Sequence, residues 1–284
     1  MELSGSVLES SAQSGTHANT DAGSSPTGRL RAALAARGPQ GSTTGWRGFS
    51  WQILLLLPPS LLYFGVRELS ADQRSEAFEN AASISSLQKA LGLDWEYSLQ
   101  QRVLDSDWVI AAVNWIYIYG HFPLLLVAML ILYRMHRREF LNLRNALIAS
   151  GAIGLICFAV YPVAPPRLFD PTAFFDTVGE LSTSYRILQN PSVTNQFAAV
   201  PSFHVGWNLL VAIALWRATR LRPIKALAVL LPLLMIASVV LTANHWIVDI
   251  LAGMGVAMVG LSAACAFNRF VTPKLVAQQI ASHH

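Results

Sequence analysis

The stretch NHWIVD, residues 244–249, opens the last long apolar segment of the chain and carries two ionisable side chains. His245 and Asp249 are four residues apart, so they lie on one face of a helix. Ionisable groups are costly to place beside a bilayer, which makes them functional candidates by default. The spacing allows the carboxylate to hold the imidazole in one tautomer and to stabilise its cationic form.

A second motif, PSFH at residues 201–204, stands where a loop enters an earlier apolar segment. Pro201 ends the loop, and Ser202 is a strong candidate for the N-cap of the following helix. A helix start offers free N–H groups and the positive end of the helix dipole, so an anion such as phosphate could dock there. His204 would then lie in the first turn and face that anion.

Other interpretations of the two motifs stay open. Ser202 could be a cap and nothing more, and His204 a packed residue at a helix interface. His245 and Asp249 could form an intrahelical hydrogen bond that neutralises a buried carboxylate, or supply two ligands to zinc. Because no further Cys, His or carboxylate stands at a recognisable ligand spacing, we predict no metal site.

The composition is that of a membrane protein: 53% of the 284 residues are apolar and only 13% are charged, against about 25% charged in a typical soluble domain. We predict an all-α fold, a polytopic bundle of six transmembrane helices, because six segments are apolar over a length close to that of a span. Cys157 and Cys265 both fall inside these segments and are interpreted as packing residues. The predicted spans are Phe49–Val66, Trp108–Tyr133, Ala146–Val163, Phe203–Ala218, Ile224–Leu241 and Trp246–Phe267.

The positive charges indicate how the bundle is oriented. Fourteen of the twenty Lys and Arg residues precede the first span, follow the last, or lie between spans two and three or four and five. The positive-inside rule therefore puts both termini in the cytoplasm. The outward loops 164–202 and 242–245 then meet the two histidine motifs, so we predict an extracytoplasmic site in an integral protein of the plasma (inner) membrane.

The remaining segments give a simple domain organisation. Residues 1–47 are rich in Ser, Thr, Gly and Ala, and we predict a disordered cytoplasmic tail. A transit peptide is the weaker alternative, and no cleavable signal is expected. The membrane domain is predicted at 48–270, with a cytoplasmic tail at 271–284. In the outward loop 67–107, Ser75–Leu91 has an apolar period typical of a helix, which we expect in the membrane interface.

Two further groups of polar side chains could bind a substrate. Tyr161 and Arg167 end span three on the outward side, and a guanidinium offers a fork of donors suited to phosphate. Asn114, Tyr117 and His121 form a polar stripe along one face of span two. That stripe could bind a lipid head group or serve as an interhelical hydrogen-bond cluster.

The ordered set Tyr-Pro-x-Ala-Pro-Pro, Pro-Ser-x-His and His-x3-Asp resembles the type-2 phosphatidic acid phosphatase superfamily, and within it the inositol phosphorylceramide synthase-like branch. The resemblance covers roughly residues 155–260. It implies a metal-independent enzyme without a cofactor. His245 would be the nucleophile that becomes a phosphohistidine, Asp249 its orienting partner, and His204 the general acid and base. Ser202 and Arg167 would bind the phosphate.

The chain also departs from the superfamily pattern. No Lys stands six residues before Arg167, and Val239 occupies the position of an arginine that precedes the last histidine in the superfamily. Fewer cations would therefore meet the phosphate, which fits the synthase-like branch better than a plain phosphatase.

These features favour a lipid phosphotransferase, with a lipid phosphatase that uses water as acceptor as the alternative. The expected donor is a phospholipid or a polyprenyl phosphate, and the acceptor a sugar or an inositol-containing molecule. Membrane lipids are the expected surroundings, and no nucleic-acid partner is expected. A polytopic transporter or scaffold with intramembrane histidines remains an alternative of another class.

Overall fold

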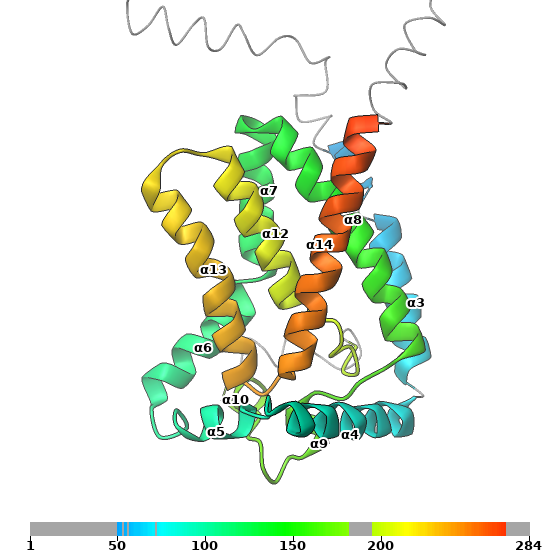
Figure 1. The fold of residues 1–284 in the computed structure, drawn as a ribbon, viewed down its shortest axis with the longest axis vertical. Helices are drawn as coiled ribbons and strands as arrows, with labels where there is room; N and C mark the ends of the chain where they lie inside the picture. The colour runs from blue at the N-terminus through cyan, green and yellow to red at the C-terminus, as the bar shows by residue number, and fades with distance from the viewer. Residues whose placement is uncertain (1–49, 53, 56, 72, 182–194, 271–284) are drawn as a thin grey trace, which may run out of the picture. The chain divides into compact units, whose positions relative to one another are not determined.

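The computed structural model describes residues 50–52, 54–55, 57–71, 73–181 and 195–270, and within them the fold is a bundle of helices (Figure 1). The predicted tails, 1–47 and 271–284, lie outside the described residues. The helices in chain order are α3 (Leu57–Ala71), α4 (Arg74–Leu91), α5 (Glu96–Gln101), α6 (Asp107–Tyr119), α7 (Phe122–Met135), α8 (Arg137–Val160), α9 (Pro166–Phe169), α10 (Thr177–Leu181), α12 (Phe203–Ala218), α13 (Arg222–Leu241) and α14 (Ile247–Phe270).

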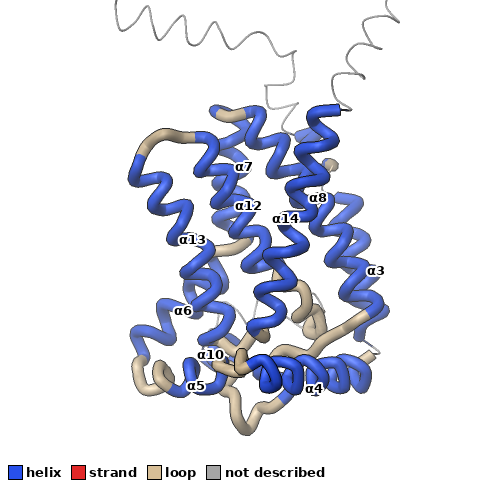
Figure 2. Tube along the Cα trace, viewed as in Figure 1, coloured by secondary structure: helices blue, strands red, loops and turns tan. Residues whose placement is uncertain are grey.

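The prediction of an all-α fold is confirmed. In the described part of the chain the helices are joined by loops, with one isolated parallel β-bridge between Val163 and Ala198 (Figure 2). That bridge fastens the segment before α12 to the segment after α8. Val163 donates its N–H to the Phe197 carbonyl over 2.8 Å, and the chain leaving the bridge runs directly into the histidine motif at 201–204.

Three described helices, α8, α13 and α14, are long and apolar enough to cross a membrane, and α6 with α7 makes a fourth when the bent pair is counted as one span. We predicted a single helix over Trp108–Tyr133, and this is wrong in detail, because the pair is bent by 49° between Tyr119 and Phe122. Pro123 lies in the first turn of α7 and has no N–H to continue the α6 ladder. The carbonyl of Gly120 at the break accepts a hydrogen bond from Asn208 Nδ2 over 3.1 Å instead.

The predicted helix Ser75–Leu91 is present as α4, which lies across one end of the bundle beside α5 and α9 (Figure 1). Its buried face differs from the predicted one. The apolar period that predicts this helix consists of Phe78, Ala81, Ile84, Leu87 and Leu91. Of these, Ala81 and Ile84 are buried, but Leu87 and Leu91 are about half exposed, whereas Gln88 is fully buried. The apolar period alone could not show this shift, since it gives no reason to bury a glutamine.

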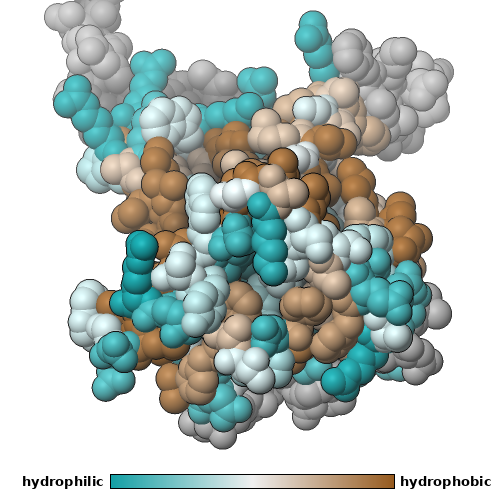
Figure 3. Space-filling model, turned by 60° about the horizontal axis from the view of Figure 1, so that its bottom comes forward, coloured by the Kyte–Doolittle hydropathy of each residue, from teal (hydrophilic) through white to brown (hydrophobic). Residues whose placement is uncertain are grey.

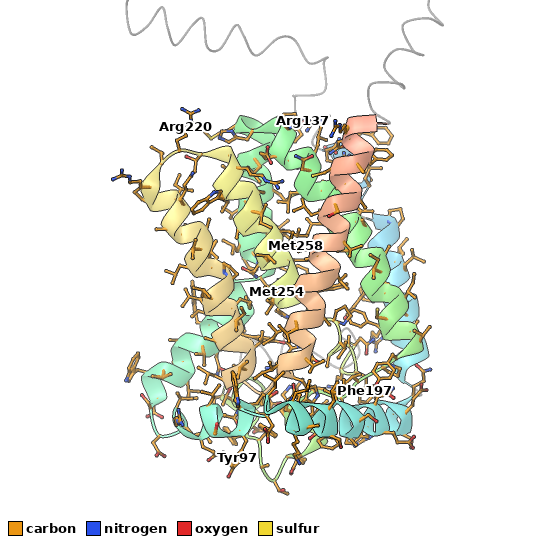
Figure 4. The ribbon with its side chains drawn as sticks, viewed as in Figure 1. Tyr97, Arg137, Phe197, Arg220, Met254 and Met258 are labelled. Carbon is orange, nitrogen blue, oxygen red and sulfur yellow. The ribbon has the colours of Figure 1, made fainter. Side chains whose placement is uncertain are left out.

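The two ends of the bundle differ in chemistry. Arg137 and Arg220 lie at the end opposite to Tyr97 and Phe197, which mark the end that α4 covers (Figure 4). With the covered end turned towards the viewer, hydrophilic and hydrophobic residues mix on that face, while much of the side is hydrophobic (Figure 3). Exposed leucines on the sides, such as Leu126, Leu233 and Leu251, fit a surface that contacts lipid.

The contact between α12 and α14 is close because two glycines meet there. A Cβ atom at Gly253 would overlap the Ser202 backbone, and one at Gly206 would lie 2.5 Å from the Gly253 carbonyl oxygen. Small residues let helix backbones approach in this way. Ser202 N–H also donates to the Asp249 carbonyl over 3.0 Å. The first turns of α12 and α14, which carry the two histidine motifs, are therefore held against each other.

We expect Gly253→Ala to lower the stability of the protein by about 1–3 kcal/mol, because the added methyl group forces α12 away from α14. The measurement is thermal unfolding in detergent micelles. Gly255→Ala is the matched control, since a Cβ at Gly255 meets nothing within 4 Å. Equal melting temperatures for the two variants would contradict the tight contact.

Candidate active site

His245 is fixed by the loop between α13 and α14 before the last helix begins. The imidazole is almost fully buried, with an exposed fraction of 5%. Its Nδ1 lies 2.9 Å from the Ala199 carbonyl oxygen and 3.3 Å from Asp249 Oδ2. A carbonyl can only accept, so Nδ1 carries the proton and donates it. The lone pair of the neutral ring is then on Nε2, which is the form a nucleophilic histidine needs.

The electrostatics of the loop keep this ring neutral. Burial lowers the pKa of His245, the hydrogen bond to the Ala199 carbonyl opposes this shift, and the positive charge of Arg167 adds to it. The resulting pKa is about 4. The β-bridge at Val163 places the Ala199 carbonyl, which sequence reasoning missed. No sequence signal identifies a backbone carbonyl 46 residues away as the closer partner of the ring.

Asp249 stands where the sequence predicted it, one turn beyond His245, but its shortest contact is with the backbone. Oδ2 accepts the Trp246 N–H over 2.8 Å, which is the reach-back half of a capping box at the start of α14. Oδ1 is buried, with no hydrogen-bond partner among the described residues. The carboxylate therefore caps the helix and approaches the imidazole with the same oxygen.

His204 lies in the first turn of α12, and its ring centroid is 5.6 Å from that of His245. The structure thus brings the two sequence motifs together. Two of the three residues of the predicted polar stripe also surround this ring. Tyr117 stacks on it at 4.6 Å between centroids, and His121 lies at 4.5 Å.

Asn114 and Tyr161, which were also predicted to bind substrate, are placed differently. Asn114 exchanges hydrogen bonds with Thr177, donating from Nδ2 to the Thr177 carbonyl and accepting the Thr177 hydroxyl, both over 2.9 Å. It therefore holds α10 against α6. Tyr161 is partly exposed at the end of α8 and is not among the rings stacked around His204.

Ser202 occupies the N-cap position of α12, as predicted, but its side chain makes no cap hydrogen bond. The residue is fully buried, and within the described chain its Oγ has no hydrogen-bond partner. A buried hydroxyl without a partner is costly, and the first N–H groups of an α-helix have no intrahelical acceptor. The start of α12 therefore receives no cap from the side chain of Ser202, and the buried hydroxyl has no partner in this part of the structure.

Arg167 is held beside His245 by two residues that the sequence did not single out. Its Nε donates to Asn244 Oδ1 over 2.8 Å, and one terminal nitrogen pairs with Asp176 at 2.9 Å. Asn244 directly precedes His245, and this position in the motif could have marked it as a residue of the site. Asp176 carries no such signal. The guanidinium is thereby fixed next to the loop that carries the imidazole.

In the part of the chain that the structure describes, no group of three or more His, Cys, Asp or Glu residues is arranged to hold a metal ion. The arrangement instead combines a neutral imidazole, a second histidine, an uncapped helix start and an arginine. These are the components of a site that binds an anion and transfers protons to and from it.

Comparison with known protein families matches residues 82–263, more than half of the chain, to the PAP2 superfamily. Comparison with curated proteins and with solved structures gives no match. The match includes α5 through most of α14 and all three catalytic candidates. The chain belongs to the PAP2 superfamily.

Proposed function

We propose that the protein is a metal-independent membrane enzyme that transfers a phosphoryl or phospho-head group of a lipid through a phosphohistidine on His245. Members of the PAP2 superfamily are usually phosphatases or phosphotransferases, so membership suggests such an activity on lipids. The observation that carries the proposal is the pairing of His204 and His245, whose ring centroids are 5.6 Å apart, beside a helix start that the side chain of Ser202 does not cap.

In the first step, the Nε2 lone pair of His245 attacks phosphorus, and the bond from phosphorus to the leaving oxygen breaks. His204 gives a proton to that oxygen as it departs. The ring of His245 becomes positively charged, and Asp249 Oδ2 and the Ala199 carbonyl stabilise its Nδ1 proton. Ser202, the first amides of α12 and Arg167 bind the phosphate oxygens.

In the second step, His204 takes the proton of the acceptor hydroxyl, whose oxygen attacks phosphorus. The phosphorus–nitrogen bond breaks and neutral His245 returns. A sugar or inositol-containing acceptor makes the enzyme a phosphotransferase, which the resemblance to the inositol phosphorylceramide synthase-like branch favours. Water as acceptor makes it a phosphatase, and the first step is the same for both.

The proposal includes the membrane arrangement. We infer six spans, with α3 and the 16-residue α12 beside the four of sufficient length. A helix of 16 residues is about 24 Å long, shorter than the hydrocarbon layer of about 30 Å, so the start of α12 would be recessed below one surface. Helices α4 and α5 would lie in the extracytoplasmic interface, where a lipid head group enters.

Incubation with a lipid labelled on its phosphate should produce an acid-labile phosphoenzyme, and His245→Asn should abolish it. Asparagine keeps a donor at the place of Nδ1 but has no nucleophile at the place of Nε2. His136→Asn, between α7 and α8, is the matched control and should form the phosphoenzyme normally. Labelling of His245→Asn at the wild-type level would overturn the proposed nucleophile and leave the transporter alternative.

We expect Ser202→Ala to lower the turnover by about 10²-fold, in the range seen when one donor to a transition-state oxygen is removed. Its melting temperature should be unchanged, because Oγ has no hydrogen-bond partner among the residues that the structure describes. Turnover of purified protein and thermal unfolding measure the two effects. A loss of about 0.5–2 kcal/mol of stability with normal turnover would instead identify Ser202 as a structural cap.

Product analysis separates transfer from hydrolysis. With purified protein in vesicles that contain the labelled lipid, a phosphotransferase should pass the label to an added polyol such as inositol, while a phosphatase should release it as inorganic phosphate at the same rate with or without the polyol. The expected result is a labelled polyol product at least about tenfold above release to water, since a transferase must exclude water from its intermediate. Release to water alone would support the phosphatase.

A further inference from the structure

The first turn of α14 is capped by side chains from two different parts of the chain. The opening N–H groups of an α-helix have no acceptor within the helix. Asp249 Oδ2 accepts the Trp246 N–H, as described above. The next two N–H groups, of Ile247 and Val248, find their acceptors outside α14. They donate to side chains of α5 and α4, which are 151 and 160 residues away in the sequence.

Glu96 and Gln88 provide these acceptors. Glu96 Oε1 accepts the Ile247 N–H over 2.8 Å, and Gln88 Oε1 accepts the Val248 N–H over 2.9 Å. The two side chains are joined to each other, since Gln88 Nε2 donates to Glu96 Oε1 over 2.7 Å. Their exposed fractions are 2% and 0%. Buried polar groups of this kind are favourable only when they are paired, so the two helices can bury these residues only against the start of α14.

The charge of Glu96 also suits this position. A carboxylate beside the positive end of a helix is stabilised by the helix dipole. Burial raises the pKa of Glu96, and nearby Asp249 adds to this, against the hydrogen bonds from Ile247 and Gln88. One carboxylate oxygen of Glu96 accepts both hydrogen bonds, so the position of this side chain is tied to the start of α14 and to Gln88.

Helix α4 also packs against the residue that follows His245. Ala81 and Ile84 of α4 belong to one buried apolar cluster with Trp246, the residue that follows His245. The indole N–H of Trp246 donates to the Ala164 carbonyl over 2.9 Å. Two backbone amides and the apolar contacts of Trp246 thus connect α4 and α5 to the residues that directly follow the imidazole.

From this geometry we infer that Gln88 and Glu96 are positioning residues: they fix the first turn of α14 so that His245 presents Nε2 towards His204. The inference rests on the proposed function, because it deepens the account of the same nucleophile. A displacement of about 1 Å of a reacting group can cost about 10²-fold in rate, even when the responsible residue is far from the chemistry. Neither side chain touches the substrate in this account.

The test compares Glu96→Ala, Glu96→Gln and Gln88→Ala in the full-length protein in vesicles with the labelled lipid. Glu96→Ala and Gln88→Ala should slow phosphoenzyme formation per folded molecule by about 10- to 100-fold, with KM for the lipid little changed. Glu96→Gln should restore the rate to within about threefold of wild type, since the Gln Oε1 can accept both N–H groups.

Gln100→Ala is the matched control. Gln100 is a fully buried amide in the same helix α5, but it bonds the carbonyls of Phe175 and Leu241 and the N–H of Phe175, not the start of α14. The Gln100→Ala variant should lower the melting temperature as Gln88→Ala does, and its rate per folded molecule should stay within about threefold of wild type. An equal loss of rate in Gln100→Ala, or a Glu96→Gln as slow as Glu96→Ala, would overturn the positioning role.

A second readout keeps this inference distinct from the proposed function. The imidazole nitrogens of ¹⁵N-histidine-labelled protein report the tautomer of His245 without any reaction. Wild type and Glu96→Gln should show a single form protonated on Nδ1, and Glu96→Ala a mixture. A wild-type protein that forms no phosphoenzyme would overturn the proposed function alone. An unchanged single tautomer in both Glu96→Ala and Gln88→Ala, with unchanged rates, would overturn the positioning role.

Discussion

The site depends on the close contact between the first turns of α12 and α14. Gly206 and Gly253 remove the side chains that would separate the two backbones, and the Ser202 N–H to Asp249 carbonyl bond fixes their register. Because His204 is in one of these turns and His245 precedes the other, the distance between their rings follows from backbone packing. The chemistry of the site is therefore set by how closely two helices approach.

Sequence reasoning identified the two motifs because each contains its own helix start. The four-residue step from His245 to Asp249, and the position of Ser202 before an apolar run, are local features that a helix must preserve. What the sequence could not show are contacts between distant segments. A β-bridge brings the Ala199 carbonyl to His245. Two helices that cross the end of the bundle bring Glu96 and Gln88 to the start of α14. Gln88 even stands on the face where the apolar period predicted Leu87.

The spans show the same limit. Composition located every apolar segment, and α8, α13 and α14 appear within a few residues of the predicted bounds, apart from the earlier start of α8. Hydropathy does not register a missing N–H, so the break caused by Pro123 in an otherwise apolar run was not expected. That break has a consequence for the site. It places His121 at the start of α7, where its ring meets His204, whereas a straight helix would continue past this point.

The two helix starts at the site differ in capping: side chains cap the start of α14, and the Ser202 side chain does not cap the start of α12. An uncapped helix start attracts an anion to its first amides. If the start of α14 were uncapped, it would compete with α12 for the phosphate and draw it towards amides that follow the nucleophile instead of towards Nε2. Asp249, Glu96 and Gln88 remove that competition by occupying the amides of α14 with protein oxygens. The start of α12, where the Ser202 hydroxyl has no partner among the described residues, is the end that the proposed function assigns to the substrate. In the proposed function, a phosphate bound at the start of α12 would lie against His204 and in front of His245, so the capping of α14 would favour anion binding at α12.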